Sequence, residues 1–102
     1  MAEIDAKTIT KVYVACEAGM GSSVMLTSQL KKRLGKYGVD VAHSQVNALP
    51  EDAQLVLCHA GLSSRAKQRV PNAVVIPFQM FMGDPAFDTV ESAIRDGGTL
   101  VG

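Results

Sequence analysis

A glycine-rich run lies between an apolar stretch and a helical pattern, and this order constrains the fold more than any other feature. Residues 11–15 read as a strand, and the chain continues as Cys16-Glu17-Ala18-Gly19-Met20-Gly21-Ser22-Ser23. A strand that turns through glycines into a helix points several backbone N–H groups at one place, where the helix dipole adds partial positive charge. The sequence therefore predicts an anion cradle that begins with a thiol.

The chemistry expected of this cradle centres on Cys16. A field that binds phosphate oxygens also lowers the pKa of a cysteine thiol and makes it a better nucleophile. We therefore predict that Cys16 becomes transiently phosphorylated. Ser22 and Ser23 are expected to cap the helix and to offer a hydroxyl to a phosphoryl oxygen. Because a carboxylate repels phosphate, Glu17 should point away from the cradle, toward solvent or a basic surface on a partner.

Length and composition fit one domain without a metal or cofactor. The 102 residues are 47% hydrophobic, and ten basic residues balance ten acidic ones, so nucleic acid is not an expected partner. We expect residues 1–10 to form a flexible N-terminal extension. The sequence offers no apolar run of about 20 residues and no signal peptide, which favours a cytoplasmic location. The two cysteines have dissimilar surroundings, so we expect reduced thiols.

Four apolar runs, at residues 11–15, 39–45, 54–58 and 73–77, alternate with helical patterns. This alternation predicts a parallel sheet with crossover helices. Right-handed crossovers and short loops favour the strand order 2-1-3-4. The expected fold is therefore a three-layer α/β/α domain of the flavodoxin-like or phosphatase-I-like type.

Three helical patterns connect these strands. The first covers residues 22–37, where a leucine appears at every fourth position from 26 to 34, and Gly38 provides its stop. The second is a short helix that ends before Pro71. The third begins with Asp84 as N-cap and Pro85 as its first residue, and it stops at Gly97.

Ligands of such sheets bind at the carboxyl ends of the strands. Cys16 follows the end of the first strand, and we expect residues 44–47, 59–63 and 78–84 to converge on it. Among them His59 is a candidate auxiliary residue, because as an imidazolium it would stabilise the thiolate or the phosphoryl group.

Other candidate residues have simpler explanations. Cys58 lies in a continuous apolar run and is expected in the core, with oxidation to Cys16 as the minor alternative. For Met20 and Met25 we favour core filling over a docking surface. Charged side chains that we expect to be solvated rather than catalytic are those of Lys31, Lys32, Arg33 and Arg65.

At these residues the sequence resembles the IIB components of the bacterial sugar phosphotransferase system (PTS), and specifically the mannitol branch. The resemblance covers nearly the whole chain from Lys11 onward. Three segments carry it: residues 15–23; residues 47–50, Asn-Ala-Leu-Pro; and residues 55–59, which lead on to Arg65-Ala66 and Val70-Pro71. The first segment is specific, and the others corroborate it.

The resemblance implies that Cys16 accepts a phosphoryl group from a phosphohistidine on a IIA protein. Cys16 then passes the group to a sugar or polyol held by a membrane IIC permease, so that this protein is peripherally associated with the membrane. The family's phosphoryl-binding loop carries over onto residues 17–23, with Glu17 where the family has aspartate, and His59 also matches the mannitol pattern. The sugar, and whether the chain is a separate subunit, an excised domain or a paralogue, stay open.

Two other functions compete with this interpretation. A low-molecular-weight cysteine phosphatase has a similar strand, loop and helix, but this chain has Ser22 where that enzyme's arginine clamps the transition state. The motif Asp84-Pro85 resembles its late general acid, although a helix cap explains the pair. The other alternative is a IIB-like regulatory module whose phosphorylation on Cys16 reports sugar flux to a protein partner.

Overall fold

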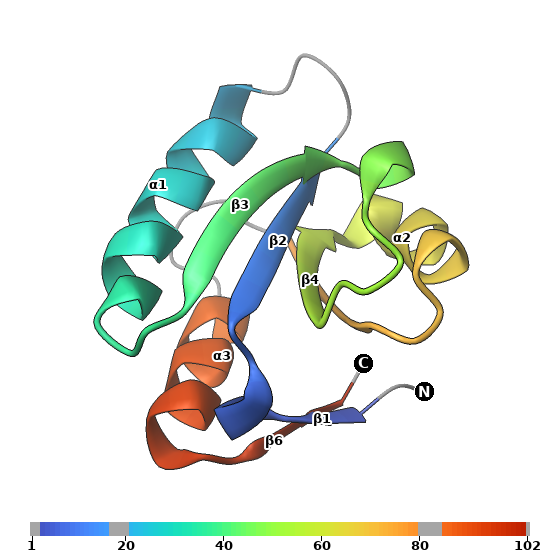
Figure 1. Ribbon diagram of the computed structural model, residues 1–102. Helices are drawn as coiled ribbons and strands as arrows, with labels where there is room; N and C mark the ends of the chain where they lie inside the picture. The colour runs from blue at the N-terminus through green and yellow to red at the C-terminus, as the bar shows by residue number, and fades with distance from the viewer. Residues whose placement is uncertain (1–2, 17–20, 80–84, 102) are drawn as a thin grey trace.

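The centre of the computed structural model, which describes residues 3–16, 21–79 and 85–101, is a four-stranded parallel sheet (Figure 1). The order across the sheet is β3-β2-β4-β5. Counted along the chain within this sheet, it is the predicted order 2-1-3-4, and each strand lies within one residue of its predicted range. The four strands are β2 (Lys11–Cys16), β3 (Asp40–Gln45), β4 (Leu55–His59) and β5 (Val74–Phe78).

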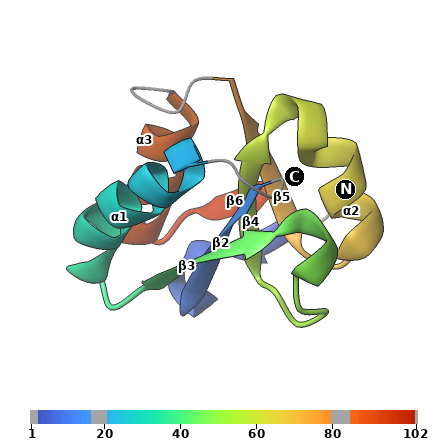
Figure 2. The same cartoon turned by 90° about the horizontal axis from the view of Figure 1, so that it is seen from above.

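Helices cover both faces of the sheet. Figure 2 shows α1 (Gly21–Gly35) and α3 (Pro85–Asp96) on one face and α2 (Ser63–Arg69) on the other. Two short 3-10 helices, η2 (Val46–Ala48) and η3 (Ala60–Leu62), follow the ends of β3 and β4. The predicted three-layer α/β/α architecture is therefore confirmed. Within the described ranges, no helix combines the length and the apolar character that crossing a bilayer requires.

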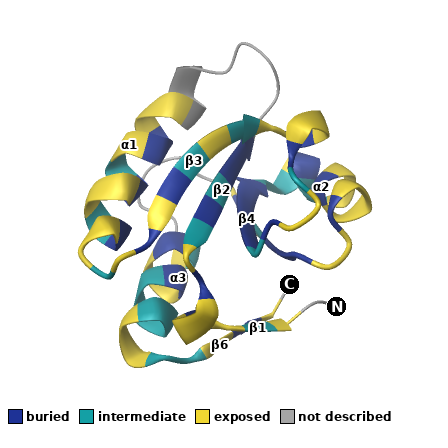
Figure 3. Cartoon of the chain, in the orientation of Figure 1, coloured by how far each residue is buried: buried dark blue, intermediate teal, exposed yellow. Residues whose placement is uncertain are grey.

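Two hydrophobic clusters hold the layers together, and the alternation of side chains along β4 divides them. Leu55 and Leu57 pack with α1 and α3, whereas Val56 and Cys58 pack with α2. All four are fully buried, because a parallel strand at the centre of a three-layer fold has helices on both sides. Figure 3 shows the buried residues gathered along β2 and β4, with exposed residues on the outer sides of the helices.

Glycines end the two long helices, as predicted. After α1, Gly38 has φ of +80°, Val39 N donates to Leu34 O at 3.3 Å, and Gly38 N donates to Gly35 O at 3.0 Å. This is the Schellman arrangement, which needs a residue in the left-handed region. Gly97 has φ of +75° and ends α3 in the same way. Pro85 is the first residue of α3, whereas its predicted cap, Asp84, lies outside the described residues.

The N-terminal segment differs from the expected flexible extension. Strand β1 (Glu3–Asp5) pairs antiparallel with β6 (Thr99–Val101), and the 3-10 helix η1 (Ala6–Thr8) follows it. Ala6 and Ile9 are buried in the cluster beneath α1 and α3. The structure therefore builds residues 3–9 into the domain, because two short segments from opposite ends of the chain satisfy each other's backbone groups.

Hydrogen bonds of the half-buried Gln54 side chain fix the chain between η1 and β2. Its Oε1 accepts hydrogen bonds from Thr10 N at 2.8 Å and Lys11 N at 3.3 Å, and its Nε2 donates to Thr8 O at 2.9 Å. The side chain thus sets where β2 begins, and β2 carries Cys16 at its other end.

Candidate functional site at the carboxyl end of the sheet

Cys16 is the last residue of β2, one of the two central strands. Its backbone pairs with Gln45, the last residue of β3, and on the other side Ala15 pairs with Cys58 of β4. Because all four strands are parallel, their carboxyl ends meet at one edge of the sheet. The predicted convergence is therefore confirmed for the described parts of the three segments, residues 44–47, 59–63 and 78–79.

The N-terminus of α1 lies next to this edge. Only residues 17–20 separate the end of β2 from Gly21, where α1 begins. The backbone of Gly21, Ser22 and Ser23 forms the first turn, which contains no acidic residue. A helix N-terminus has N–H groups without intrahelical partners and a partial positive charge, and both favour an anion. Of the predicted loop, Glu17, Ala18, Gly19 and Met20 lie outside the described residues.

His59 occupies the same edge on β4. The last pair in the register of β2 and β4 is Ala15 with Cys58, so the next residues, Cys16 and His59, lie opposite each other. Adjacent strands are about 4.8 Å apart, so the two backbones are close at this point. Its Nδ1 accepts a hydrogen bond from Gly61 N at 3.2 Å, which caps η3. Its ring meets Phe78 of β5 edge to face, with 6.2 Å between ring centroids. The structure thus brings His59 close to Cys16 in the sheet and holds its ring from two sides.

Cys58 is a core residue, as predicted. Its side chain is fully buried and makes no disulfide. Burial raises the pKa of this thiol to about 11, against a smaller opposite effect of Lys67. A protonated, enclosed thiol is a poor nucleophile at neutral pH, so Cys58 is not a candidate for a reactive thiol.

The basic residues of α1 have two different environments. Lys31 and Lys32 are exposed, as expected, and so is Arg65 of α2. The expectation of a solvated side chain was wrong for Arg33, which is half-buried and reaches α3. Its Nε and Nη2 donate to Glu91 Oε1 at 2.9 and 2.6 Å. Arg33 therefore joins α1 to α3 and has a structural partner.

The prediction of core filling was wrong for Met25. The side chain is 62% exposed, and its neighbour Val24 is 54% exposed. The buried face of α1 contains Leu26, Leu30 and Leu34. Met25 directly precedes Leu26, and successive side chains of a helix point about 100° apart, so Met25 lies off this face. Sequence reasoning missed that two apolar side chains would remain uncovered beside the first turn of α1.

The described side chains offer no group of three or more metal-ligating residues. The edge of the sheet brings together a cysteine, the backbone donors of a helix N-terminus and a histidine. Such a set fits the transfer of an anionic group through a thiolate, because amide hydrogens can hold the oxygens of that group.

Comparison with known proteins decides the family. The family model described as "PTS system, Lactose/Cellobiose specific IIB subunit" matches residues 11–92, from the start of β2 into α3. The chain therefore belongs to the PTS IIB family. The resemblance found in the sequence is confirmed, and the matched range contains the whole parallel sheet with Cys16 and His59.

Relatives of this IIB protein include mannitol-specific components. An EIICB component of Geobacillus stearothermophilus is 40% identical over 89 residues, which are 85% of this chain and 19% of that protein. A Pasteurella multocida EIICBA component is 42% identical over 84 residues, 80% of this chain and 14% of the relative. A Bacillus subtilis EIICB component is 37% identical over 95 residues, 91% of this chain and 20% of the relative. The chain thus spans 14 to 20% of the length of these curated relatives.

Proposed function

We propose that this IIB protein is a phosphocarrier in which Cys16 holds the phosphoryl group. The observation that carries the proposal is the order of elements around Cys16: the residue ends a central parallel strand, four residues follow, and α1 then presents its N-terminus. Membership in the PTS IIB family supports the same function. The phosphoryl-binding loop comprises residues 17–23, with Ser22 and Ser23 as hydroxyl donors.

The reaction has two balanced steps. The Cys16 thiolate attacks the phosphorus of a phosphohistidine on a IIA protein, so that an S–P bond forms and the N–P bond breaks. A hydroxyl oxygen of the acceptor then attacks the phosphorus, the S–P bond breaks, the thiolate returns and the hydroxyl proton goes to a base. Backbone N–H groups of the loop and of α1 stabilise the equatorial oxygens in both steps.

The acceptor in this proposal is a sugar or polyol bound by a membrane IIC permease, with the protein acting at the cytoplasmic side. The curated relatives named above are mannitol-specific, which favours a mannitol-like polyol. The name of the matching family model refers to lactose and cellobiose. A comparison of polyols with disaccharides as acceptors therefore tests the substrate class.

A IIA protein must bring its phosphohistidine to Cys16, and the surface beside α1 supports this. Val24 and Met25 leave apolar surface exposed, and exposed Lys31 and Lys32 follow on the same helix. We propose that the phosphorylated IIA protein docks on Val24 and Met25, with acidic groups facing the lysines. The argument for this occupant is that the patch adjoins the loop into which the donor must reach.

The test of the proposed function is a phosphorylation assay with phosphoenolpyruvate, the general PTS proteins and a panel of IIA proteins. Mass spectrometry is expected to locate one phosphate on Cys16 with the matching IIA. Cys16→Ser should remain folded and lose both phosphate acceptance by this residue and delivery to membranes containing a IIC permease. Full transfer in Cys16→Ser would refute the assignment.

The same assay tests the regulatory alternative, and a separate assay with an aryl phosphate tests the phosphatase alternative. A regulatory module would accept phosphate on Cys16 and fail to restore sugar phosphorylation with any IIC membrane. A phosphatase would turn over an aryl phosphate, which we do not expect, because position 22 holds serine where a phosphatase has its arginine.

A further inference from the structure

The side chain of His59 lies on the face of the sheet that α1 and α3 cover. Side chains alternate along a strand, so His59 shares the face of Leu55 and Leu57, which pack in the cluster under those helices. Its ring contact confirms this, because Phe78 belongs to the same cluster. His59 is thus level with Cys16 in the sheet and on the side where the loop enters α1.

The hydrogen bond of His59 to the backbone fixes its tautomer. Gly61 N is a donor, so the Nδ1 atom that accepts its hydrogen bond at 3.2 Å must present a lone pair. A neutral imidazole then carries its proton on Nε2. An imidazolium would carry a proton on both nitrogens, and the cap of η3 would be lost. This hydrogen bond therefore favours a neutral His59 as the alternative to the imidazolium expected from the sequence.

We propose that His59 works as a neutral Nε2–H donor that gives a hydrogen bond to an oxygen of the phosphoryl group on Cys16. Its Nδ1 holds the turn at η3, and Phe78 holds the ring edge to face, so that the donor is oriented before the phosphoryl group arrives. No proton is transferred, and the N–H bond stays intact in both steps. This inference rests on the proposed function of Cys16.

Two variants separate the roles of the two ring nitrogens. In His59→Asn the side-chain Oδ1 can accept the bond from Gly61 N, while nothing stands at the Nε2 position. In His59→Gln the amide nitrogen can reach the Nε2 position, while the cap is lost. We expect His59→Asn to slow phosphoryl transfer about tenfold to a hundredfold, the effect of one hydrogen bond to a charged group, with an unchanged unfolding midpoint.

His59→Gln is expected to transfer the phosphoryl group at a rate within a few-fold of that of the unsubstituted protein. Its unfolding midpoint should be lower, because the cap of η3 is lost. The proposal is overturned if His59→Asn transfers at the normal rate, or if His59→Gln is as slow as His59→Asn. A protein that takes no phosphate on Cys16 even with His59 in place would instead refute the proposed function.

A spectroscopic measurement tests the tautomer without any transfer assay. Two-bond ¹H–¹⁵N correlation spectra of the ¹⁵N-labelled protein at neutral pH should show Nδ1 without a proton and Nε2 with one. A spectrum with both nitrogens protonated, or with the proton on Nδ1, would overturn the inference. Cys16→Ser provides the matched sample, because its His59 should give the same spectrum whether or not phosphate can bind.

Discussion

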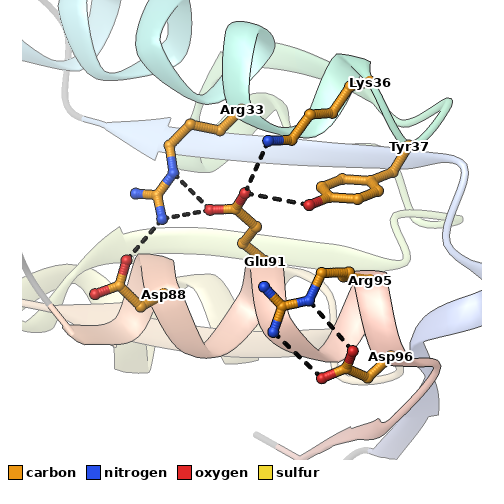
Figure 4. Close-up of polar contacts among 7 residues, drawn as sticks. All are labelled: Arg33, Lys36, Tyr37, Asp88, Glu91, Arg95 and Asp96. Atoms are coloured by element: carbon orange, nitrogen blue, oxygen red, sulfur yellow. Dashed lines mark hydrogen bonds and ion pairs between the residues drawn. The ribbon is translucent and has the colours of Figure 1, made fainter.

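Replacing Glu91 by glutamine is expected to loosen the contact between α1 and α3. Figure 4 shows the Glu91 carboxylate facing Arg33 of α1 and the two residues Lys36 and Tyr37 that follow this helix. Arg33 reaches Glu91 Oε1 with two nitrogens, at 2.9 and 2.6 Å, and Lys36 Nζ lies 3.6 Å from Oε2. The Glu91 side chain is only 18% exposed, so the substitution removes a charge from a mostly buried carboxylate.

The magnitude follows from the two short bonds to Arg33. A hydrogen bond to a charged acceptor contributes about 1.5–3 kcal/mol and one between neutral groups about 0.5–1.5 kcal/mol, so glutamine loses about 1 kcal/mol at each bond. Because the Arg33 side chain is 35% exposed, solvent screening reduces the sum to about 1 kcal/mol. For a domain of this size that lowers the unfolding midpoint by roughly 4–8 °C.

The pH dependence of this difference has a definite sign. Hydrogen bonds from Arg33 lower the pKa of the Glu91 carboxyl, against the opposite effect of burial. A lowered pKa in the folded state stabilises the fold above the pKa of the unfolded state, about 4.3, and the stabilisation is lost as pH falls through the folded-state pKa. The two proteins should therefore differ at pH 7, and their free energies of unfolding should converge as the pH falls from about 4.3 through the folded-state pKa of Glu91.

Urea unfolding followed by circular dichroism at a series of pH values measures the difference in free energy of unfolding between the unsubstituted protein and Glu91→Gln. The reasoning would be refuted if the two proteins were equally stable at pH 7, or if their difference in stability were unchanged at the lowest pH values. Asp96→Asn is the matched control, because its partner Arg95 is a neighbour on the same helix and both side chains are more than half exposed. The control is expected to give no measurable change in stability.

Two further predictions concern the thiol in the core and the docking surface. Iodoacetamide at pH 8 should leave Cys58 unmodified in the folded protein and alkylate it only after unfolding, since burial raises the pKa of this thiol to about 11. Peptide mass spectrometry that finds rapid alkylation of Cys58 in the folded protein would contradict this prediction. Met25→Glu should raise the IIA concentration needed for half-maximal phosphorylation about tenfold. Val101→Glu, on the exposed side of β6 at the opposite end of the domain (Figure 1), is the control, and equal effects of the two variants would remove Met25 from the interface.

Local patterns in the sequence determined most of the fold. The four apolar runs predicted the strands of the parallel sheet within one residue, and Gly38 and Gly97 predicted where α1 and α3 end. Both kinds of feature depend on neighbouring residues: a buried strand needs a continuous apolar run, and a left-handed turn needs a glycine. The position of Cys16 at the carboxyl end of β2 followed from the same patterns.

Contacts between distant residues were decided only by the tertiary structure. No local pattern predicts the pairing of β1 with β6, because each strand is too short to give a clear signal on its own. No local pattern predicts the ion pair of Arg33 with Glu91 either, because each charged side chain would be solvated in isolation. Whether Met25 is covered depends on which side of α1 faces the sheet. The hydrogen bond that His59 Nδ1 accepts from Gly61 N depends on a backbone N–H whose direction is set only once η3 has formed.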